Sequence, residues 1–285
     1  MLRRAIATPL PTQRQEHLVA EGQSGIVGFA AAQINRSERD DTEFGNFAAI
    51  LVAPKAQRQG IGHALHDEML SRLKASGVTR MQIGGLYPRL WPGIPANLPG
   101  AKAFFTAMGW DLKDHVVDLA RDLRDYEIPG DLRQRMASER LTLEPAVESD
   151  VEAVFELERK YFPGWLQTIS YVASVGDFRD FLVARDPDKG IVGALVMTTP
   201  DSHPSRVDAL WTTVLGDQLG AMNEVGVAES ERGRGIGIAL VAWGSETLKL
   251  RGVHKCTIGW TNLVDFYGKA GYRPWQEFDY GWRTL

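Results

Sequence analysis

The sequence predicts an α/β protein made of two copies of one unit, each containing a mixed sheet flanked by helices. Three observations support this fold class. Short blocks recur in the same order in both halves, and each half has a strand followed by a glycine-rich turn and an amphipathic helix. A length of 285 residues also leaves room for two domains.

Within each repeated block, the offset between matching residues of the two copies is constant. The blocks recur at offsets of 165, 175 and 162 residues: 25–28 with 190–193, 50–62 with 225–237, and 104–110 with 266–272. Because the offset changes only between blocks, the two copies share one order of elements and differ in the lengths of their loops.

Each element of the unit has its own signal in the sequence. The first block closes a turn and opens an apolar run, which predicts the second strand of a hairpin. In the middle block Pro54 ends a β-rich run. Leu65, Met69 and Leu73 then share one helical face, and Gly77 is the expected stop. The second copy repeats this pattern, and the predicted order is β, β, β, α, β, α, β.

The two copies have unequal fronts. Residues 124–140 carry many charges and no apolar period, which indicates a linker. We therefore expect a first unit over residues 1–123 and a second over 141–285, the second opening with a strand and an amphipathic helix around Val154. The first copy is much shorter ahead of its hairpin, so we expect it to lack the opening strand and helices.

Composition and charge exclude several classes of function. With 32 Lys and Arg against 36 Asp and Glu, the formal net charge is −4, so no overall basic field favours nucleic acid or an anionic membrane. The single cysteine, Cys256, forbids an intrachain disulfide and fits a core position in a reducing compartment. No run of 18 apolar residues lacks a charge, and Pro9 and Pro11 interrupt the first apolar stretch. We expect a cytoplasmic protein without a membrane span, of undetermined oligomeric state.

A glycine-rich turn between a strand and a helix occurs once in each copy. Such a turn points backbone N–H groups and the positive end of the helix dipole at one place, where phosphate is the usual occupant. The motif Gly-x-Gly is weak by itself. The third glycine of the dinucleotide fingerprint is absent, and no Lys-Ser/Thr follows as in a P-loop.

The turns and the blocks around them resemble a known superfamily. Two motifs are similar to the Gln/Arg-x-x-Gly-x-Gly/Ala signature of the GNAT N-acetyltransferases: Gln57-x-x-Gly60-x-Gly62 and Arg232-x-x-Gly235-x-Gly237. The resemblance covers nearly the whole chain as two tandem units. It implies a mostly antiparallel sheet in each unit and acetyl-CoA as co-substrate. It also implies direct attack by an acceptor amine, which needs a base for the amine proton and an acid for the departing thiolate.

The resemblance also implies a CoA site along each turn, with the pantetheine arm pairing to the open edge of the strand before it. In the second copy it places there Val225, Val227, Arg232, Gly233, Arg234, Gly235, Ile236 and Gly237. In the first copy it places there Val52, Gln57, Arg58, Gln59, Gly60, Gly62 and Asn97. Asn97 matches the family's CoA-contacting asparagine better than Asn262, which lies too close to Tyr267.

Two residues of the second copy have the chemistry that the resemblance requires. Tyr267 occupies the position of a family tyrosine that protonates the CoA sulfur, and Glu224 could act as general base directly or through a water. The first copy has Phe105 and Ala49 at these positions, so we expect the second unit to be catalytic. The alternatives are an aromatic ring that only packs the last helix and a glutamate that is only solvated.

Aromatic residues mark possible acceptor walls. Tyr161 and Trp165 lie between the opening helices of the second unit, where the family builds this wall, so we expect them to contact substrate; core packing is the alternative. The first copy has an insertion around residues 86–95 whose Tyr87 could serve a similar purpose, although a packed loop explains it equally well.

Two histidines on the first signature helix have the spacing of a metal-binding pair. His63 and His66 are three residues apart, but a third ligand is missing. We therefore expect both on the helix surface and no metal.

These features predict an acetyl-CoA-dependent N-acetyltransferase acting on a primary amine of a small molecule, with the second unit catalytic. Two rivals stay open. A sensor that holds CoA or an amine without turnover fits the decayed first copy, and a protein or peptide N-acetyltransferase would need an extended groove. Amino sugars, amino acids, polyamines and aminoglycoside-like drugs all remain as acceptors, because acceptor walls are loops.

Overall fold

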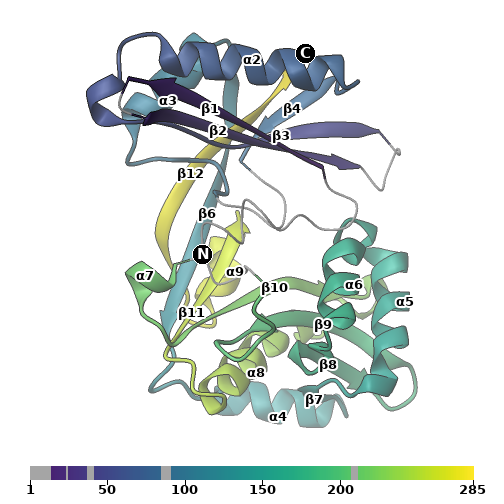
Figure 1. Ribbon diagram of the computed structural model, residues 1–285. Helices are drawn as coiled ribbons and strands as arrows, with labels where there is room; N and C mark the ends of the chain where they lie inside the picture. The colour runs from purple at the N-terminus through teal and green to yellow at the C-terminus, as the bar shows by residue number, and fades with distance from the viewer. Residues whose placement is uncertain (1–13, 24, 37–41, 85–90, 207–210) are drawn as a thin grey trace. The chain divides into compact units, whose positions relative to one another are not determined.

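The computed structural model describes residues 14–23, 25–36, 42–84, 91–206 and 211–285. They form two compact units, whose strands and helices are labelled in Figure 1. The predicted α/β class is confirmed, because helices flank mostly antiparallel strands in both units.

The two units divide the chain inside two long strands. Unit 1 consists of the part up to Val116 together with Gln276–Leu285, and unit 2 is Val117–Trp275. The chain leaves unit 1 within β6 (Asp111–Asp122) and returns to it within β12 (Arg273–Thr284).

These units differ from the predicted ranges, which kept each sequence copy whole. Leu119 of β6 pairs with Ile258 in the sheet of unit 2, and Trp282 of β12 pairs with Gln82 in the sheet of unit 1. The last strand of each copy therefore hydrogen-bonds in the other copy's sheet. The repeats predict the order of strands along the chain, but they carry no information about which sheet a final strand joins.

The described residues of unit 1 form a sheet with two helices. Besides its parts of β6 and β12 it contains β1 (Arg14–Gly22), β2 (Gly25–Arg36), β3 (Glu43–Val52), α2 (Ile61–Ala75), β4 (Arg80–Ile83), β5 (Ile94–Pro95) and α3 (Pro99–Ala107). The strand order is β1-β2-β3-β4-β12, with β5 paired to β12. Neighbouring strands run antiparallel, except β3 and β4, which are parallel.

Helix α2 has the buried face that its sequence predicts. Leu65, Met69 and Leu73 are buried in one core with strand residues such as Ala30 and Phe47. The two copies share this strand, turn and helix, so this core forms around the most strongly repeated part of the sequence.

One prediction about this helix is wrong. His63 is exposed as expected, but His66 is fully buried. Its ring stacks on Phe47 with centroids 5.7 Å apart, and its Nε2 accepts a hydrogen bond from Trp110 Nε1 at 2.9 Å. Burial lowers the pKa of His66, so it is a neutral core residue.

Unit 2 is the larger of the two. Its elements, besides parts of β6 and β12, are α4 (Gly130–Ser138), β7 (Thr142–Pro145), α5 (Val151–Tyr161), α6 (Leu166–Ser174), β8 (Phe181–Asp186), β9 (Gly190–Thr198), α7 (Thr212–Leu215), β10 (Leu219–Val227), α8 (Ile236–Leu250), β11 (Lys255–Thr261) and α9 (Val264–Gly268). The strand order is β6-β11-β10-β9-β8-β7. Among the described residues, unit 1 has no counterpart of β7, α5 and α6, which agrees with the predicted shorter front.

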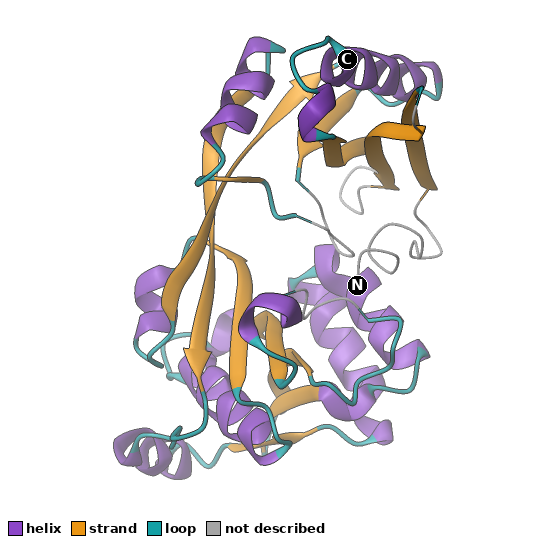
Figure 2. Ribbon diagram, turned by 60° about the vertical axis from the view of Figure 1, so that its left-hand side comes forward, coloured by secondary structure: helices purple, strands orange, loops and turns teal. Residues whose placement is uncertain are grey.

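The sheet of unit 2 is covered on both faces, as Figure 2 shows. Strand β8 demonstrates the alternation: Leu182 and Ala184 are buried in the core that contains α8, whereas Phe181 and Val183 are buried with α5 and α6. Residues of the strands between these two layers are therefore fixed from both sides.

The segment predicted to be a linker is packed into unit 2. It contains α4, and Tyr126, Ile128 and Met136 are buried in the same core as α8. Met136 is the one buried residue of α4, so this segment has little apolar periodicity for sequence analysis to detect. In the part of the chain that the structure describes, no helix is long and apolar enough to cross a membrane.

Candidate active site

Strands β10 and β11 separate inside unit 2. They pair in parallel over four residues ending at Met222 and Ile258. Two residues further along lie Glu224 on β10 and Trp260 on β11, both in the left-handed region with φ of +52° and +51°. Residues other than glycine rarely adopt this conformation, and they do so preferentially at functional sites.

A β-bulge places Glu224. The pairing of β10 with β9 shifts between Asn223 and Gly226, so Glu224 and Val225 together stand opposite one residue, Leu195. The bulge removes Glu224 from the regular ladder at the position where β10 parts from β11. This is the strand that the sequence predicted to line the acetyl site.

A second carboxylate, which the sequence did not predict, interacts electrostatically with Glu224. Glu158 of α5 is fully buried, and neither of its carboxylate oxygens has a hydrogen-bond partner among the described residues. Burial, and then the charge of Glu224, raise the pKa of Glu158 to about 8. The signal in the sequence was a glutamate four residues after Val154, on a helix face where an apolar residue is expected.

Tyr267 lies in α9, buried at 7% exposure and packed edge-to-face against Phe266 with ring centroids 4.9 Å apart. Burial raises the pKa of its phenol to about 12. The phenol therefore keeps its proton at neutral pH, as a proton donor must.

The turn before α8 contains three glycines, and the structure requires glycine at these positions for different reasons. Gly233 and Gly235 are left-handed with φ of +85°, and Gly235 is the residue that caps α8. Gly237 has an ordinary backbone, but a Cβ there would lie 3.3 Å from the Phe266 ring. The first two glycines give the turn a backbone shape typical of anion-binding turns at helix N-termini, and Gly237 leaves room for the aromatic residue of α9.

The turn carries two arginines, one held in ion pairs and one exposed. Arg234, predicted to contact CoA, is paired with Glu139 (2.7 Å), Asp186 (3.1 Å) and Glu231 (2.5 Å). Its guanidinium therefore ties the turn to its neighbours, and its backbone N–H is the group left for a ligand. Arg232 is exposed.

Arg135 is a further cation at the turn that the sequence analysis missed, because it lies in the segment taken for a linker. Its Nη2 donates to the carbonyl oxygen of Gly233 at 2.9 Å, and a Cβ on Gly235 would come within 2.9 Å of its guanidinium carbon. Among the described residues it has no ion-pair partner.

The predicted acceptor wall is aromatic and is attached to β10. Tyr161 and Trp165 are half-buried, and Trp165 stacks on Phe162 with ring centroids 4.6 Å apart. Phe162 lies directly on β10, because a Cβ on Gly226 would come within 2.7 Å of its ring. The sequence prediction included the outer two aromatics and missed Phe162, the one that touches the strand carrying Glu224.

Three tryptophans lie on or near β11, on the other side of the gap between β10 and β11. Asp118 of β6 is buried and accepts a hydrogen bond from the backbone N–H of Trp260 (2.9 Å) and from Trp211 Nε1 (3.3 Å). Trp211 packs edge-to-face on Trp275 at 5.0 Å. The buried Nε1 of Trp275 has no acceptor among the described residues.

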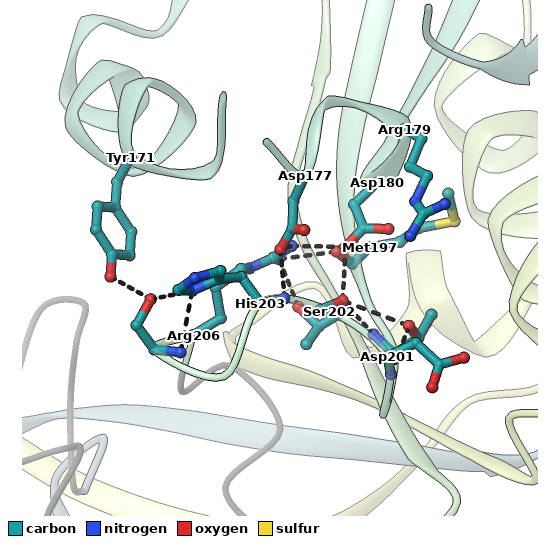
Figure 3. A network of polar contacts seen from close by, with 12 residues as sticks. Tyr171, Asp177, Arg179, Asp180, Met197, Asp201, Ser202, His203 and Arg206 are labelled. Carbon is teal, nitrogen blue, oxygen red and sulfur yellow. Dashed lines mark hydrogen bonds and ion pairs between the residues drawn. The ribbon is translucent and has the colours of Figure 1, made fainter. Parts of the chain in front are cut away.

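A polar network anchors the connection from β9 towards Trp211 (Figure 3). Arg206 is buried and donates to Asp180 (2.7 Å) and to the carbonyl oxygen of Met197 (2.8 Å). Tyr171 of α6 donates to Ser205 at 2.6 Å. Because its charges are paired within the network, we assign it a structural role: it fixes the start of this connection.

Unit 1 repeats the framework without the glutamate and the tyrosine. The pairing of β2 and β3 also shifts, but there Ala48 is the extra residue of the β3 bulge and Ala49 stays paired with Ala31. Ala49 stands in place of Glu224 and buried Phe105 in place of Tyr267. A cavity of about 120 Å³ there has an apolar lining that includes Phe47, Ala48, Ala49, Ile83, Trp91 and Phe105. Tyr87 lies outside the described residues.

The turn of unit 1 is also open. The predicted CoA residues that are exposed are Gln57, Arg58, Gln59, Gly60 and Asn97, while Val52 and Gly62 are half-buried. Arg58 has φ +63° where unit 2 has Gly233. A Cβ on Gly60 would meet nothing within 4 Å, so no described side chain covers this turn as Arg135 covers its counterpart.

Comparison with known proteins assigns both halves of the chain to one family. The acetyltransferase (GNAT) domain matches residues 13–111, and the acetyltransferase (GNAT) family matches residues 151–272. The chain belongs to the GNAT superfamily, with two of its domains in tandem, and is an acetyl-CoA-dependent N-acetyltransferase. The resemblance seen in the two turn motifs is thereby confirmed.

Curated relatives share most of the chain at low identity. The mycothiol acetyltransferase of Nocardia farcinica is 26% identical over 269 residues, which are 90% of this chain and 79% of that protein. The mycothiol acetyltransferase of Mycolicibacterium paratuberculosis is 28% identical over 254 residues, 84% of this chain and 71% of that protein.

Among solved structures, a glucosamine N-acetyltransferase region of a fungal multi-domain β-N-acetylglucosaminidase is similar at a TM-score of 0.93 and 35% identity. The match covers 99% of this chain and 34% of that protein, so this chain spans about a third of its length. A tandem GNAT protein from the clavulanic acid biosynthesis pathway has a TM-score of 0.67 at 15% identity, covering 99% of this chain and 86% of that one, and is alike in fold.

Proposed function

We propose that unit 2 transfers the acetyl group of acetyl-CoA to the primary amine of an amino sugar, and that unit 1 does not catalyse this reaction. One observation carries the assignment to unit 2. Two equivalent frameworks hold a glutamate and a tyrosine in unit 2, but an alanine and a phenylalanine in unit 1: Glu224 against Ala49 and Tyr267 against Phe105.

The turn of unit 2 has the groups that acetyl-CoA needs. Backbone N–H groups at the N-terminus of α8 suit a pyrophosphate, and Arg135 and Arg232 add positive charge beside them. Val225 and Val227 lie on the strand edge where a pantetheine arm would pair. Acetyl-CoA supplies the activated acetyl group when it is bound.

The catalytic roles follow from chemistry and position. Glu224 is the base that removes a proton from the acceptor amine, because its carboxylate lies where β10 and β11 separate. Tyr267 donates a proton to the departing sulfur, because its phenol remains protonated through the neutral range.

An amino sugar is the acceptor class that we favour. The glucosamine N-acetyltransferase region matches almost the whole chain at 35% identity, the highest identity among the similar proteins described above. The half-buried rings of Tyr161 and Trp165 offer flat apolar surface suited to the C–H face of a sugar ring, and the carboxylates suit its amine.

The test is thiol release from acetyl-CoA with a panel of amines: glucosamine, galactosamine, spermidine, lysine and a peptide with a free N-terminus. We expect the highest kcat/KM with a hexosamine, and its loss in Glu224→Gln. Tyr126→Phe, which changes a buried phenol elsewhere in unit 2, serves as a control for folding. Preference for the peptide, or CoA binding without turnover of any amine, would contradict the proposal.

A further inference from the structure

Glu158 is an anomaly in the core of unit 2. A buried carboxylate normally has a cation or several donors as partners, because desolvation of its charge costs free energy. Glu158 has 0% exposure, and both of its oxygens lack a hydrogen-bond partner among the described residues. Packing alone would favour a leucine or methionine at this position of the helix.

The end of α5 that follows Glu158 packs on β10 near the bulge that carries Glu224. The carbonyl oxygen of Glu158 accepts the backbone N–H of Phe162, whose ring covers Gly226 on β10. Glu224 lies two residues before Gly226, at the bulge. Of the described charged groups, Glu224 is the one that acts on Glu158; Arg159 and Lys160, its neighbours on α5, are exposed.

We propose that Glu158 is the positioning partner of Glu224, a second carboxylate whose charge makes Glu224 a stronger base towards the cationic amine of the acceptor. This inference rests on the proposed function and names a residue for it. It also accounts for the cost of burying Glu158, since two adjacent carboxylates attract an ammonium group more strongly than one.

The proton balance shows what the pair does. An acceptor enters as R–NH₃⁺ and leaves as R–NH–CO–CH₃, so nitrogen loses two protons while an N–C bond forms and a C–S bond breaks. Glu224 takes the first proton and passes it to solvent. The second, lost as the N–C bond forms, replaces the proton that Tyr267 gives to sulfur. Glu158 acts on the first of these transfers by holding negative charge beside Glu224.

The charge of Glu158 depends on pH. The pKa of about 8 means that the neutral acid prevails at pH 7 and the carboxylate above pH 8 in the free protein. A bound ammonium group favours the ionised form. The pair should therefore be treated as one titrating system whose second ionisation lies near pH 8.

The decisive experiment is the pH profile of kcat/KM, measured with acetyl-CoA and the best amine of the panel for the wild type and Glu158→Gln. Dividing one profile by the other removes the titration of the amine itself. We expect a loss of about ten-fold or more that grows as pH rises through 8. Glu156→Gln, an exposed position on the same helix, is the matched control and should match the wild type.

A second measurement separates this inference from the proposed function. The ionisation of Glu158 can be followed by carboxyl infrared or NMR titration, and its signal is identified as the one that Glu158→Gln removes. In Glu224→Gln the pKa of Glu158 should be lower. An unchanged titration in Glu224→Gln, or a flat ratio of the two pH profiles, would overturn the inference even if the wild type acetylates glucosamine. Absence of turnover in the wild type would overturn the proposed function, and the titration would still decide the coupling.

Discussion

Glu224 and Trp260 occupy equivalent positions on the two strands that separate in unit 2. Each lies two residues beyond the last residue of its strand that pairs β10 with β11, and each has a left-handed backbone, with φ of +52° and +51°. This conformation costs about 1–3 kcal/mol for each residue, so contacts with neighbouring residues must stabilise both of them. For Trp260 that support includes Asp118, which accepts its backbone N–H at 2.9 Å.

Asp118→Ala should therefore destabilise unit 2. The change leaves the Trp260 N–H and the Trp211 ring N–H without their buried acceptor, which costs about 1–3 kcal/mol. Urea unfolding measures this difference. Asp111→Ala, at an exposed ion pair with Lys113 on the same strand, should stay within about 0.5 kcal/mol of the wild type. Equal effects of the two changes would show that Asp118 does not support the site.

Arg135→Ala should weaken acetyl-CoA binding while leaving the chemical step unchanged. Its guanidinium lies on the glycine turn, and loss of one charge-assisted contact to phosphate corresponds to about a ten-fold rise in the KM for acetyl-CoA. Steady-state kinetics at fixed amine concentration give KM and kcat separately. Arg140→Ala, which removes an exposed arginine paired with Asp188, is the control. An unchanged KM in Arg135→Ala would remove this residue from the CoA site.

Glu158→Gln should make the protein more stable at alkaline pH. Because the folded-state pKa of about 8 exceeds the ordinary value of 4.5, the folded protein keeps a proton that the unfolded chain loses. The contribution of this group to the free energy of unfolding is therefore fully present below pH 4.5. It falls by about 5 kcal/mol as the pH rises from 4.5 to 8. Urea unfolding at pH 5 and pH 9 should show the advantage of the variant only at pH 9. A pH-independent difference would mean that Glu158 is not buried as a titrating acid.

Gly226→Ala should disturb the acceptor wall. The new Cβ would come within 2.7 Å of the Phe162 ring, which must move, and such overpacking costs about 1–3 kcal/mol. We expect a higher KM for the amine with little change in the KM for acetyl-CoA. Gly164→Ala lies in the same wall with nothing within 4 Å, and it should behave like the wild type. If both variants kept the wild-type KM for the amine, Phe162 would not shape the acceptor site.

The repeated blocks made much of the fold predictable from the sequence. Strand, glycine turn and helix were found in both copies because Leu65, Met69 and Leu73 follow a helical period and the left-handed glycines mark its start. The exchange of β6 and β12 was not predictable, since hydrogen-bond partners of a final strand leave no periodic signal. His66 was misplaced for a related reason: its burial depends on Phe47 and Trp110, which are distant in the sequence.

The sequence supports a proposal for the candidate site where family position and chemistry coincide. Glu224 and Tyr267 stand out because the first copy lacks them, so the comparison was internal to the chain. Glu158 and Arg135 have neighbours that only folding brings together: Glu158 lies on a helix that packs against β10, and Arg135 lies on α4, which has a single buried side chain. The one signal for Glu158 in the sequence was a charged residue at a position on the apolar face of an amphipathic helix.

Substitutions at equivalent positions of the two units test whether unit 2 alone catalyses acetyl transfer. The measurement is thiol release from acetyl-CoA with glucosamine for Glu224→Gln, Tyr267→Phe, Ala49→Leu and Phe105→Leu. We expect Glu224→Gln to lower kcat/KM by about 10²-fold or more and Tyr267→Phe by about ten-fold or more, while both unit 1 variants keep nearly full activity. Full activity in the unit 2 variants, with loss in Ala49→Leu or Phe105→Leu, would contradict this expectation.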